Sequence, residues 1–436
     1  MAEVEQKNNY VGNSFWILLE KASRIISGIL VGILVVRYLG AEQYGVISLG
    51  LSVIAILTII STLGLDSLVV REILTRKEDF NKILGTAFSL RLLGSLWVIL
   101  LATTWAYFNK SAETTLIFFL LSISILFQSF TVIDFHFQSQ VKGKLTAINQ
   151  VITLSVSAFT KLALIYFEAG LIWFATMAAF EAGLSAMIQI YFYRNQGFKI
   201  SNWQFSRKES RFLLKYAVPL IISTAIQMIY LNADTLLIDK LLNDMSLVGQ
   251  YSAGLRISQA SYFIPIAICA AVFPGIVNNR QNRELQIMRL TQLYSLMLWL
   301  AIFVIVGALL FGDIVIGFLY GDKFPQSAII FKLHVLSSIP VFWGTAWAMW
   351  MLAEQKQKYV VAMQILIAIT VLILDLLIIP IYGISGAALS LVAGLYLALI
   401  YMVFGYNYKE NFNIFFKALN PKNLIDIMNY SLKKNK

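Results

Sequence analysis

Charged residues, cysteine and histidine are scarce in this 436-residue sequence. Charged side chains make up 13% of it and hydrophobic residues 59%, and the mean hydropathy is +0.74. Because soluble domains carry about 25% charged residues, a chain this apolar could not maintain a soluble surface. The composition therefore predicts an integral membrane protein.

The scarcity of metal ligands and nucleotide-binding motifs argues against several enzyme classes. With one cysteine, Cys269, the chain can form no internal disulfide, and His136 and His334 lie far apart in the sequence. No Walker A, GxGxxG or HExxH pattern occurs. We therefore expect no metal, no cofactor, no catalytic residues and no ATP-driven step.

Proline is absent before Pro219, whereas Pro265, Pro274 and Pro340 fall in apolar runs of the second half. Proline interrupts the hydrogen-bond ladder of a helix and bends it. The second half is therefore expected to be more bent and to contain gating helices. The alternative is that these prolines are ordinary features of membrane helices, which carry proline more often than soluble ones.

Long apolar runs separated by short polar segments predict twelve transmembrane helices. About 20 apolar residues are enough to cross a bilayer. We expect an all-α polytopic membrane protein with two six-helix bundles around a central cavity. The expected spans are 14–38, 46–64, 85–107, 115–138, 146–167, 170–193, 217–241, 250–277, 290–311, 327–352, 359–379 and 386–408.

The placement of lysine and arginine predicts the orientation. If the N-terminus is cytoplasmic, 24 of the 34 lie in cytoplasmic segments and 4 in outward segments, in agreement with the positive-inside rule. This bias accounts for the net charge of +11, so no nucleic-acid partner is expected. Both termini are predicted to be cytoplasmic.

A basic loop, 194–216, divides the chain into two halves. We expect an N-terminal lobe over 1–205, a C-terminal lobe over 206–408 and a basic cytoplasmic tail over 409–436. The tail carries intermittent apolar residues and is interpreted either as a helix lying on the anionic inner leaflet or as a partly disordered basic end.

Ionisable side chains inside the spans are the candidate functional residues, because such charges usually face a bundle interior or a wet cavity. Guanidinium and ammonium groups suit phosphate oxygens. The sequence therefore predicts a cationic cavity for an anionic substrate such as a phosphorylated lipid head group, lined by Arg24, Arg256, Arg91, Lys161 and Lys332. The alternative is that each cation only pairs with a carboxylate, as Glu20 with Arg24 or Asp234 with Arg256.

Four carboxylates inside the spans are candidates for ion coupling or for pairing with the cations. Buried carboxyl groups can take up protons or sodium ions. The candidates are Glu20, Glu181, Asp234 and Asp375.

Several short motifs resemble those of a known transporter family. The opening with Asn13 and Trp16, the segments Arg37-Tyr38-Leu39-Gly40 and Tyr44-Gly45, and the later Gly249-Gln250-Tyr251-Ser252-Ala253-Gly254-Leu255-Arg256 are similar to Wzx-type polysaccharide flippases. These belong to the multidrug/oligosaccharidyl-lipid/polysaccharide exporter superfamily. The resemblance covers essentially the whole chain. The related lipid II flippases usually have two more spans, which argues against that substrate.

This resemblance implies a mechanism and partners. Such flippases have two bundles around a cationic lumen and move undecaprenyl-pyrophosphate-linked oligosaccharides across the bacterial inner membrane, from the cytoplasmic to the periplasmic leaflet. They work by alternating access, with ion-gradient coupling suggested for the family. The expected partners are this lipid-linked substrate, membrane lipid, and polysaccharide polymerase and ligase machinery. Arg24 and Arg256 fall in the spans where relatives place lumen cations.

Two other function classes stay open at this point. A drug or cation antiporter of the same superfamily would need an acidic cavity, which the excess of basic residues inside the spans disfavours. A membrane-embedded glycan polymerase or transferase typically needs a large outward loop or a soluble catalytic domain, whereas every outward loop here is short. We therefore expect a transporter rather than an enzyme.

Overall fold

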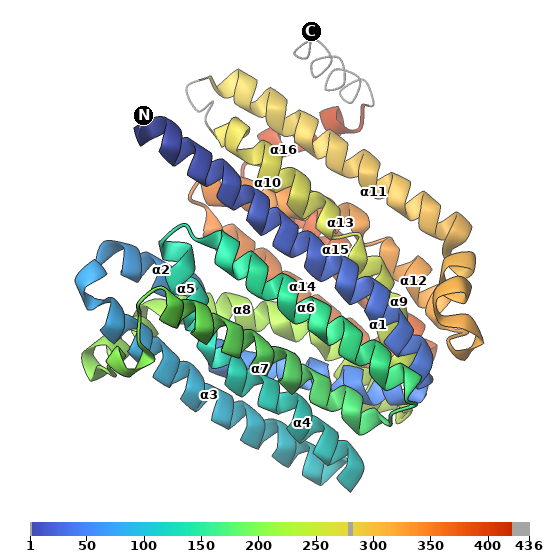
Figure 1. Cartoon of the computed structure of the whole chain (residues 1–436). Helices are drawn as coiled ribbons and strands as arrows, with labels where there is room; N and C mark the ends of the chain where they lie inside the picture. Colours follow the sequence, from blue (N-terminus) through green and yellow to red (C-terminus); the bar gives the residue numbers. More distant parts are fainter. Residues whose placement is uncertain (1, 278–281, 421–436) are drawn as a thin grey trace. The chain divides into compact units, whose positions relative to one another are not determined.

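The computed structural model describes residues 2–277 and 282–420, and within these the side chains of 2–27, 29 and 274 are outside the description. Over the described ranges the chain is helical and has no strand (Figure 1). The helices are α1 Ala2–Thr62, α2 Asp66–Thr75, α3 Phe80–Asn109, α4 Ala112–Gln128, α5 Val132–Ser139, α6 Gly143–Tyr166, α7 Leu171–Asn195, α8 Arg207–Leu242, α9 Met245–Ala260, α10 Phe263–Val277, α11 Arg283–Tyr320, α12 Ser327–Val335, α13 Ser338–Ala353, α14 Gln357–Tyr382, α15 Ile384–Phe404 and α16 Tyr408–Ala418. Four single 3-10 turns connect them: η1 Lys77–Asp79, η2 Ser129–Thr131, η3 Ile200–Asn202 and η4 Gly321–Lys323.

The number of membrane-spanning helices agrees with the expected fold class. Ten described helical segments are long and apolar enough to cross a membrane, and the pair α12 and α13, bent by 44°, makes eleven. One of these segments, Leu30–Thr75, has 46 residues, more than twice the roughly 20 needed for a single crossing. At Gly40 its backbone leaves the helical region, with φ 75° and ψ 174°. Since the first two expected spans meet near this kink, the predicted multi-pass all-α membrane fold with about twelve crossings is confirmed.

By its internal contacts the chain divides into two compact units, Met1–Asn232 and Ala233–Lys436. The boundary lies inside α8, whereas the sequence suggested a division after residue 205. The reason lies in the first half of α8, where Leu213 and Ala217 are fully buried in a hydrophobic cluster of the first unit.

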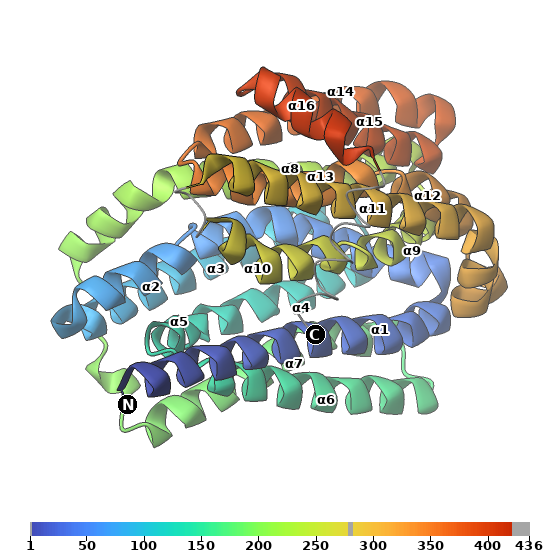
Figure 2. The same cartoon turned by 90° about the horizontal axis from the view of Figure 1, so that it is seen from above.

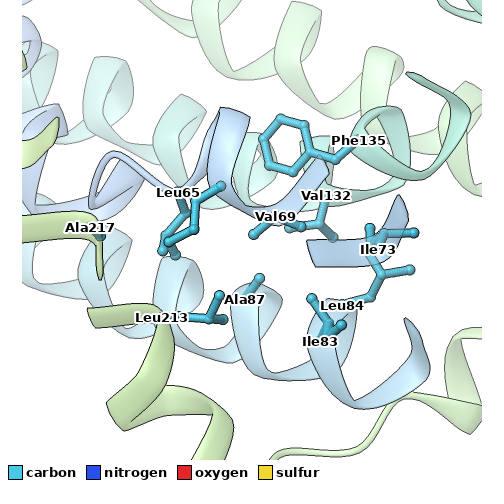
Figure 3. Close-up of a cluster of buried hydrophobic side chains, with 11 residues drawn as sticks. Leu65, Val69, Ile73, Ile83, Leu84, Ala87, Val132, Phe135, Leu213 and Ala217 are labelled. Carbon is cyan, nitrogen blue, oxygen red and sulfur yellow. The ribbon is translucent and has the colours of Figure 1, made fainter. Parts of the chain in front are cut away.

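That cluster also explains why α2 is a helix, although the sequence analysis treated 65–84 as a loop between spans. Apolar side chains recur on one face of α2 at helical spacing, at Leu65, Val69 and Ile73. They pack against side chains from α3, α5 and α8 (Figure 3). The cluster comprises Leu65, Leu68, Val69, Ile73, Ile83, Leu84, Ala87, Val132, Phe135, Leu213 and Ala217.

Helix interruptions occur in the first unit without proline, in addition to the 44° bend between α12 and α13 next to Pro340 in the second half. Between α1 and α2 the backbone of Leu63 and Gly64 is left-handed, with φ of 50° and 58°. Glycine adopts this conformation at little steric cost. A Cβ on Gly64 would lie 3.0 Å from the Cβ of Leu220, beside Pro219 in α8. The break between α1 and α2 therefore lies beside the proline of α8.

Close glycine contacts bring helices together in the second unit. After a left-handed turn at Gly383, with φ 59°, helix α15 runs back along α14 (Figure 2). A Cβ on Gly386 would lie 2.7 Å from the carbonyl oxygen of Ile378. Glycine at this position therefore allows the backbones of α14 and α15 to approach each other closely. Helix α16 follows α15 and packs against both α15 and α11.

Candidate functional site

Arg91, a predicted cavity cation, is buried in the first unit and held by a carboxylate. Its side chain is 4% exposed, and Nη1 donates a hydrogen bond to Oδ1 of Asp66 at 2.7 Å. The guanidinium also lies over the ring of Phe135, 5.4 Å from its centroid. The Asp66 side chain is 62% exposed. Arg91 therefore pairs with a carboxylate, as the alternative to a substrate cavity expected, and its partner, Asp66, was not among the candidates.

Lys161 and Glu181 form a polar contact between α6 and α7 of the first unit. The Lys161 ammonium group lies 3.1 Å from Oε2 of Glu181, and the hydroxyl of Ser157 donates to the same oxygen at 2.7 Å. Both charged side chains are about one-third exposed. Lys161, predicted as a cavity cation, and Glu181, predicted as a coupling or pairing carboxylate, thus form one ion pair.

Lys332 is paired as well, in the second unit. Its ammonium group forms an ion pair with Asp313 of α11, a carboxylate that is mostly exposed. Asp313 lies just beyond 311, where the ninth span was expected to end, whereas α11 continues to Tyr320. Asp313 could not be predicted as this partner because the expected span ended before it.

The two remaining candidate cations, Arg256 and Arg24, lie on α9 and α1. Arg256 lies on α9 of the second unit with an exposed side chain. Arg24 and Glu20 both belong to α1, four residues apart, but their side chains lie outside the described residues. Asp234 was expected to pair with Arg256 as the alternative to a substrate site. In the structure, Asp234 instead accepts a hydrogen bond from Tyr251.

Two carboxyl groups of the second unit meet inside the protein. Asp234 on α8 is 2% exposed and Asp375 on α14 is fully buried. Their carboxyl groups are close enough to interact electrostatically. The hydroxyl of Tyr251 on α9 donates to Oδ2 of Asp234. The structure thus brings together two of the four predicted coupling carboxylates.

The remaining oxygen atoms of this carboxyl pair lack donors. Ser390 of α15 lies beside Asp375, but its hydroxyl donates to the carbonyl oxygen of Gly386 at 2.9 Å. Among the described residues, neither oxygen of Asp375 nor Oδ1 of Asp234 receives a hydrogen bond from N–H or O–H. Two adjacent buried carboxylates cannot both stay ionised without a compensating cation. A proton shared between them, or a small cation held by these oxygens, satisfies the arrangement.

A second polar cluster of this unit surrounds His334 on α12. Its Nδ1 lies 2.6 Å from the hydroxyl of Ser258, and the Tyr262 hydroxyl lies 2.7 Å from that of Ser337. The side chains come from neighbouring elements, so they fix α9 against α12. Over the described ranges, no group of three or more His, Cys, Asp and Glu side chains could hold a metal ion.

Comparisons with known proteins identify the family and the fold. A family model described as polysaccharide biosynthesis protein matches residues 10–280. Curated proteins give no sequence match. The fold is similar to that of the lipid II flippase MurJ in an inward closed conformation, with a TM-score of 0.74 and 16% identity, over 93% of this chain and 90% of that chain.

Two further solved structures come from transporters of the MOP superfamily. An inward-facing multidrug resistance MATE family transporter matches with a TM-score of 0.64 and 13% identity, over 91% of this chain and 95% of that one. A MOP superfamily transporter from Pyrococcus furiosus, described as having a binding pocket of reverse polarity, matches with a TM-score of 0.57 and 13% identity, over 95% and 97%. At these identities the likeness concerns the fold, whereas the family model covers more than half of the chain. The protein therefore belongs to the polysaccharide biosynthesis protein family and has the helical fold shared by the MurJ flippase and the MATE transporters.

Proposed function

We propose that this protein is a flippase that moves an undecaprenyl-pyrophosphate-linked oligosaccharide from the cytoplasmic to the outer leaflet of the bacterial inner membrane. Membership of the polysaccharide biosynthesis family is the observation that carries this proposal. The fold supports it, because the similar structures named above are a flippase and transporters. The product would then pass to polymerase and ligase machinery.

The substrate contacts are assigned to Arg24 and Arg256. Both fall in the spans where the resemblance to polysaccharide flippases places lumen cations. An exposed guanidinium at Arg256 would bind a pyrophosphate by charge-assisted hydrogen bonds. Neutralising the phosphates lowers the cost of bringing them to membrane depth. With the inside negative, the membrane potential favours outward movement of an anion by about 2.3 kcal/mol per charge per 100 mV.

Ion coupling is assigned to the pair Asp234 and Asp375. One proton or one small cation would relieve the repulsion between these buried carboxyl groups. Binding of the proton or cation would therefore change the packing of α8 against α14, the helices that carry Asp234 and Asp375. Such a change could bias one of two conformations of the second unit and link ion movement to alternating access.

The substrate assignment is tested by complementing a strain that lacks its own polysaccharide flippase. Wild type should restore surface polysaccharide. Arg256→Gln should lower the rate about tenfold or more, since a charge-assisted hydrogen bond contributes about 1.5–3 kcal/mol. Arg207→Gln, at an exposed position where α8 begins, is the matched control and should behave as wild type. Wild-type flipping by the Arg256 variant, at equal expression, would refute the assignment.

A drug or cation antiporter is the second candidate. The buried carboxyl pair and the fold likeness to a multidrug resistance MATE transporter favour it. In that case wild-type protein should lower accumulation of cationic dyes in cells, and Asp375→Asn should abolish this effect. Dye efflux without restoration of surface polysaccharide would favour the antiporter over the flippase.

A further inference from the structure

Helix α16 presents three different faces along its length. One face packs on the second unit through Asn411, Ile414 and Ala418, which are buried. A second face is polar and includes Lys409, Asn413 and Lys417, all exposed. Between them runs an exposed apolar stripe, which we define as Tyr408, Phe412, Phe416 and Leu419. The three faces follow from helical spacing, because residues four apart share one side.

Specific contacts hold α16 in place. The guanidinium of Arg283, where α11 begins, donates to Glu354 at 2.9 Å and to Glu410 of α16 at 2.8 Å. The side-chain amide of Asn411 donates to the carbonyl oxygen of Met402 at 3.2 Å. The ring of Phe415 packs on Trp343, with ring centroids 5.2 Å apart. The orientation of the stripe is therefore fixed by the fold of the second unit.

The apolar stripe continues a membrane-spanning helix. Helix α15 is a span that ends at Phe404, an exposed residue four positions before α16 begins. The rings of Phe404 and Phe412 lie 5.7 Å apart between centroids, and those of Phe412 and Phe416 lie 4.4 Å apart. An exposed aromatic stripe directly beyond a span is typical of a helix that lies in the interfacial plane of the bilayer.

A cavity of about 550 Å³ adjoins this helix, between α16 and the beginning of α11. Its lining combines opposite charges, polar groups and apolar side chains: Lys417, Arg283, Glu284, Thr291, Asn420 and Met288. Because the spanning helix α15 ends just before α16 begins, we place the cavity at the depth of lipid head groups. An ammonium group and a carboxylate in one such cavity complement a ligand that carries both a phosphate and a primary amine.

We propose that the cavity between α11 and α16 binds the head group of an aminophospholipid, with its acyl chains along the apolar stripe. The phosphate would contact Lys417, and the ammonium group would donate to Glu284. A purely anionic head group fits less well, because Glu284 lines the cavity and Arg283 is already engaged by two carboxylates. This site is separate from the residues assigned to substrate and to ion coupling.

The first test measures the position of the helix. In a Cys269→Ala background, a single cysteine is placed at 416 on the stripe or at 413 on the polar face and labelled with an environment-sensitive dye. In nanodiscs that contain lipids with brominated acyl chains, the label at 416 should be quenched strongly and the label at 413 weakly. Absent quenching at 416, or equal quenching at both positions, would overturn the proposal.

The second test measures lipid selectivity by native mass spectrometry of the full chain. Wild type should retain phosphatidylethanolamine about tenfold better than phosphatidylglycerol, a difference expected for one charge-assisted contact. Glu284→Gln should abolish this preference and Lys417→Gln should weaken retention of both lipids. Lys409→Gln removes the same charge from α16 outside the cavity and should change neither. Preference for phosphatidylglycerol, or equal retention by all variants, would overturn the site.

Discussion

The guanidinium of Arg76 donates two hydrogen bonds to the carboxylate of Glu209, at 3.0 and 2.8 Å. Its Nε donates to Glu72 at 3.1 Å. The side chains of both carboxylates are about nine-tenths buried. The hydrogen bonds that Arg76 donates to Glu209 raise the pKa of Arg76, despite the opposing effect of burial, so its charge persists at any working pH. The contact ties the end of α2 to the beginning of α8 within the first unit.

Arg76→Gln should destabilise the first unit, because it leaves two mostly buried carboxylates without their cation. We expect a loss of about 2–4 kcal/mol, measured as a lower Tm in detergent. Lys82→Gln is the control, since its pair with Asp79 is exposed and should contribute less than about 1 kcal/mol. Equal Tm values for the two variants would contradict the proposed role of Arg76.

Asp66 and Arg91 should respond unequally to substitution, because one partner is exposed and the other is buried. Asp66→Asn leaves a buried guanidinium without a carboxylate and should cost about 3 kcal/mol. Arg91→Met leaves an Asp66 carboxylate that water can still solvate, so it should cost about 1 kcal/mol. Thermal unfolding of both single variants and the double variant measures the asymmetry. If Arg91→Met is the more damaging change, Arg91 stabilises the unit through other contacts.

Gly94→Ala should weaken the packing of α3 against α1. A Cβ at this position would lie 2.2 Å from the carbonyl oxygen of Ile60 and 2.7 Å from Cα of Ser61, both backbone atoms. We expect a loss of about 2–3 kcal/mol or a failure to accumulate folded protein. In the control Gly307→Ala, the added Cβ meets no atom within 4 Å. This control should be neutral or more stable by up to about 1 kcal/mol, as read from Tm.

Asp375→Asn should remove ion dependence without unfolding the second unit. The amide replaces one of two adjacent buried carboxyl groups, so the repulsion between them disappears and Tm should stay equal or rise. Transport in liposomes should no longer respond to an imposed proton or sodium gradient. Asp322→Asn, at an exposed carboxylate, is the control. A variant that still responds to the gradient as wild type does would exclude Asp375 from coupling.

The fold class could be predicted from the sequence because apolar runs determine membrane-spanning helices almost independently of tertiary contacts. Helix interruptions could not be predicted equally well. In the second half, prolines indicate where some helices bend. In the first half, the helix ends at Leu63 and Gly64, where no proline indicates a break. From the sequence alone, a single glycine in an apolar run can indicate either a left-handed break in the helix or a close contact between two helices.

The candidate site was predictable as a set of residues but not as a set of pairs. Asp234 and Asp375 were selected because each is an acid inside an apolar span, and both are buried. Their proximity depends on the packing of α8 and α14, which no spacing in the sequence encodes. Asp66 and Asp313 were missed as partners because the expected span limits excluded them. Tyr251 belongs to a motif that carries the family resemblance, but nothing in the sequence indicates that its hydroxyl contacts Asp234.

The helix break at Gly64, beside Pro219, has an evolutionary consequence. A side chain at position 64 would meet Leu220 and the backbone nitrogen of Ile221, which lies 3.1 Å from the Cβ position. A smaller side chain at 220 would not remove these backbone atoms, and the left-handed backbone at 64 also favours glycine. Across divergent homologues, position 64 should therefore stay glycine while the side chain at 220 varies.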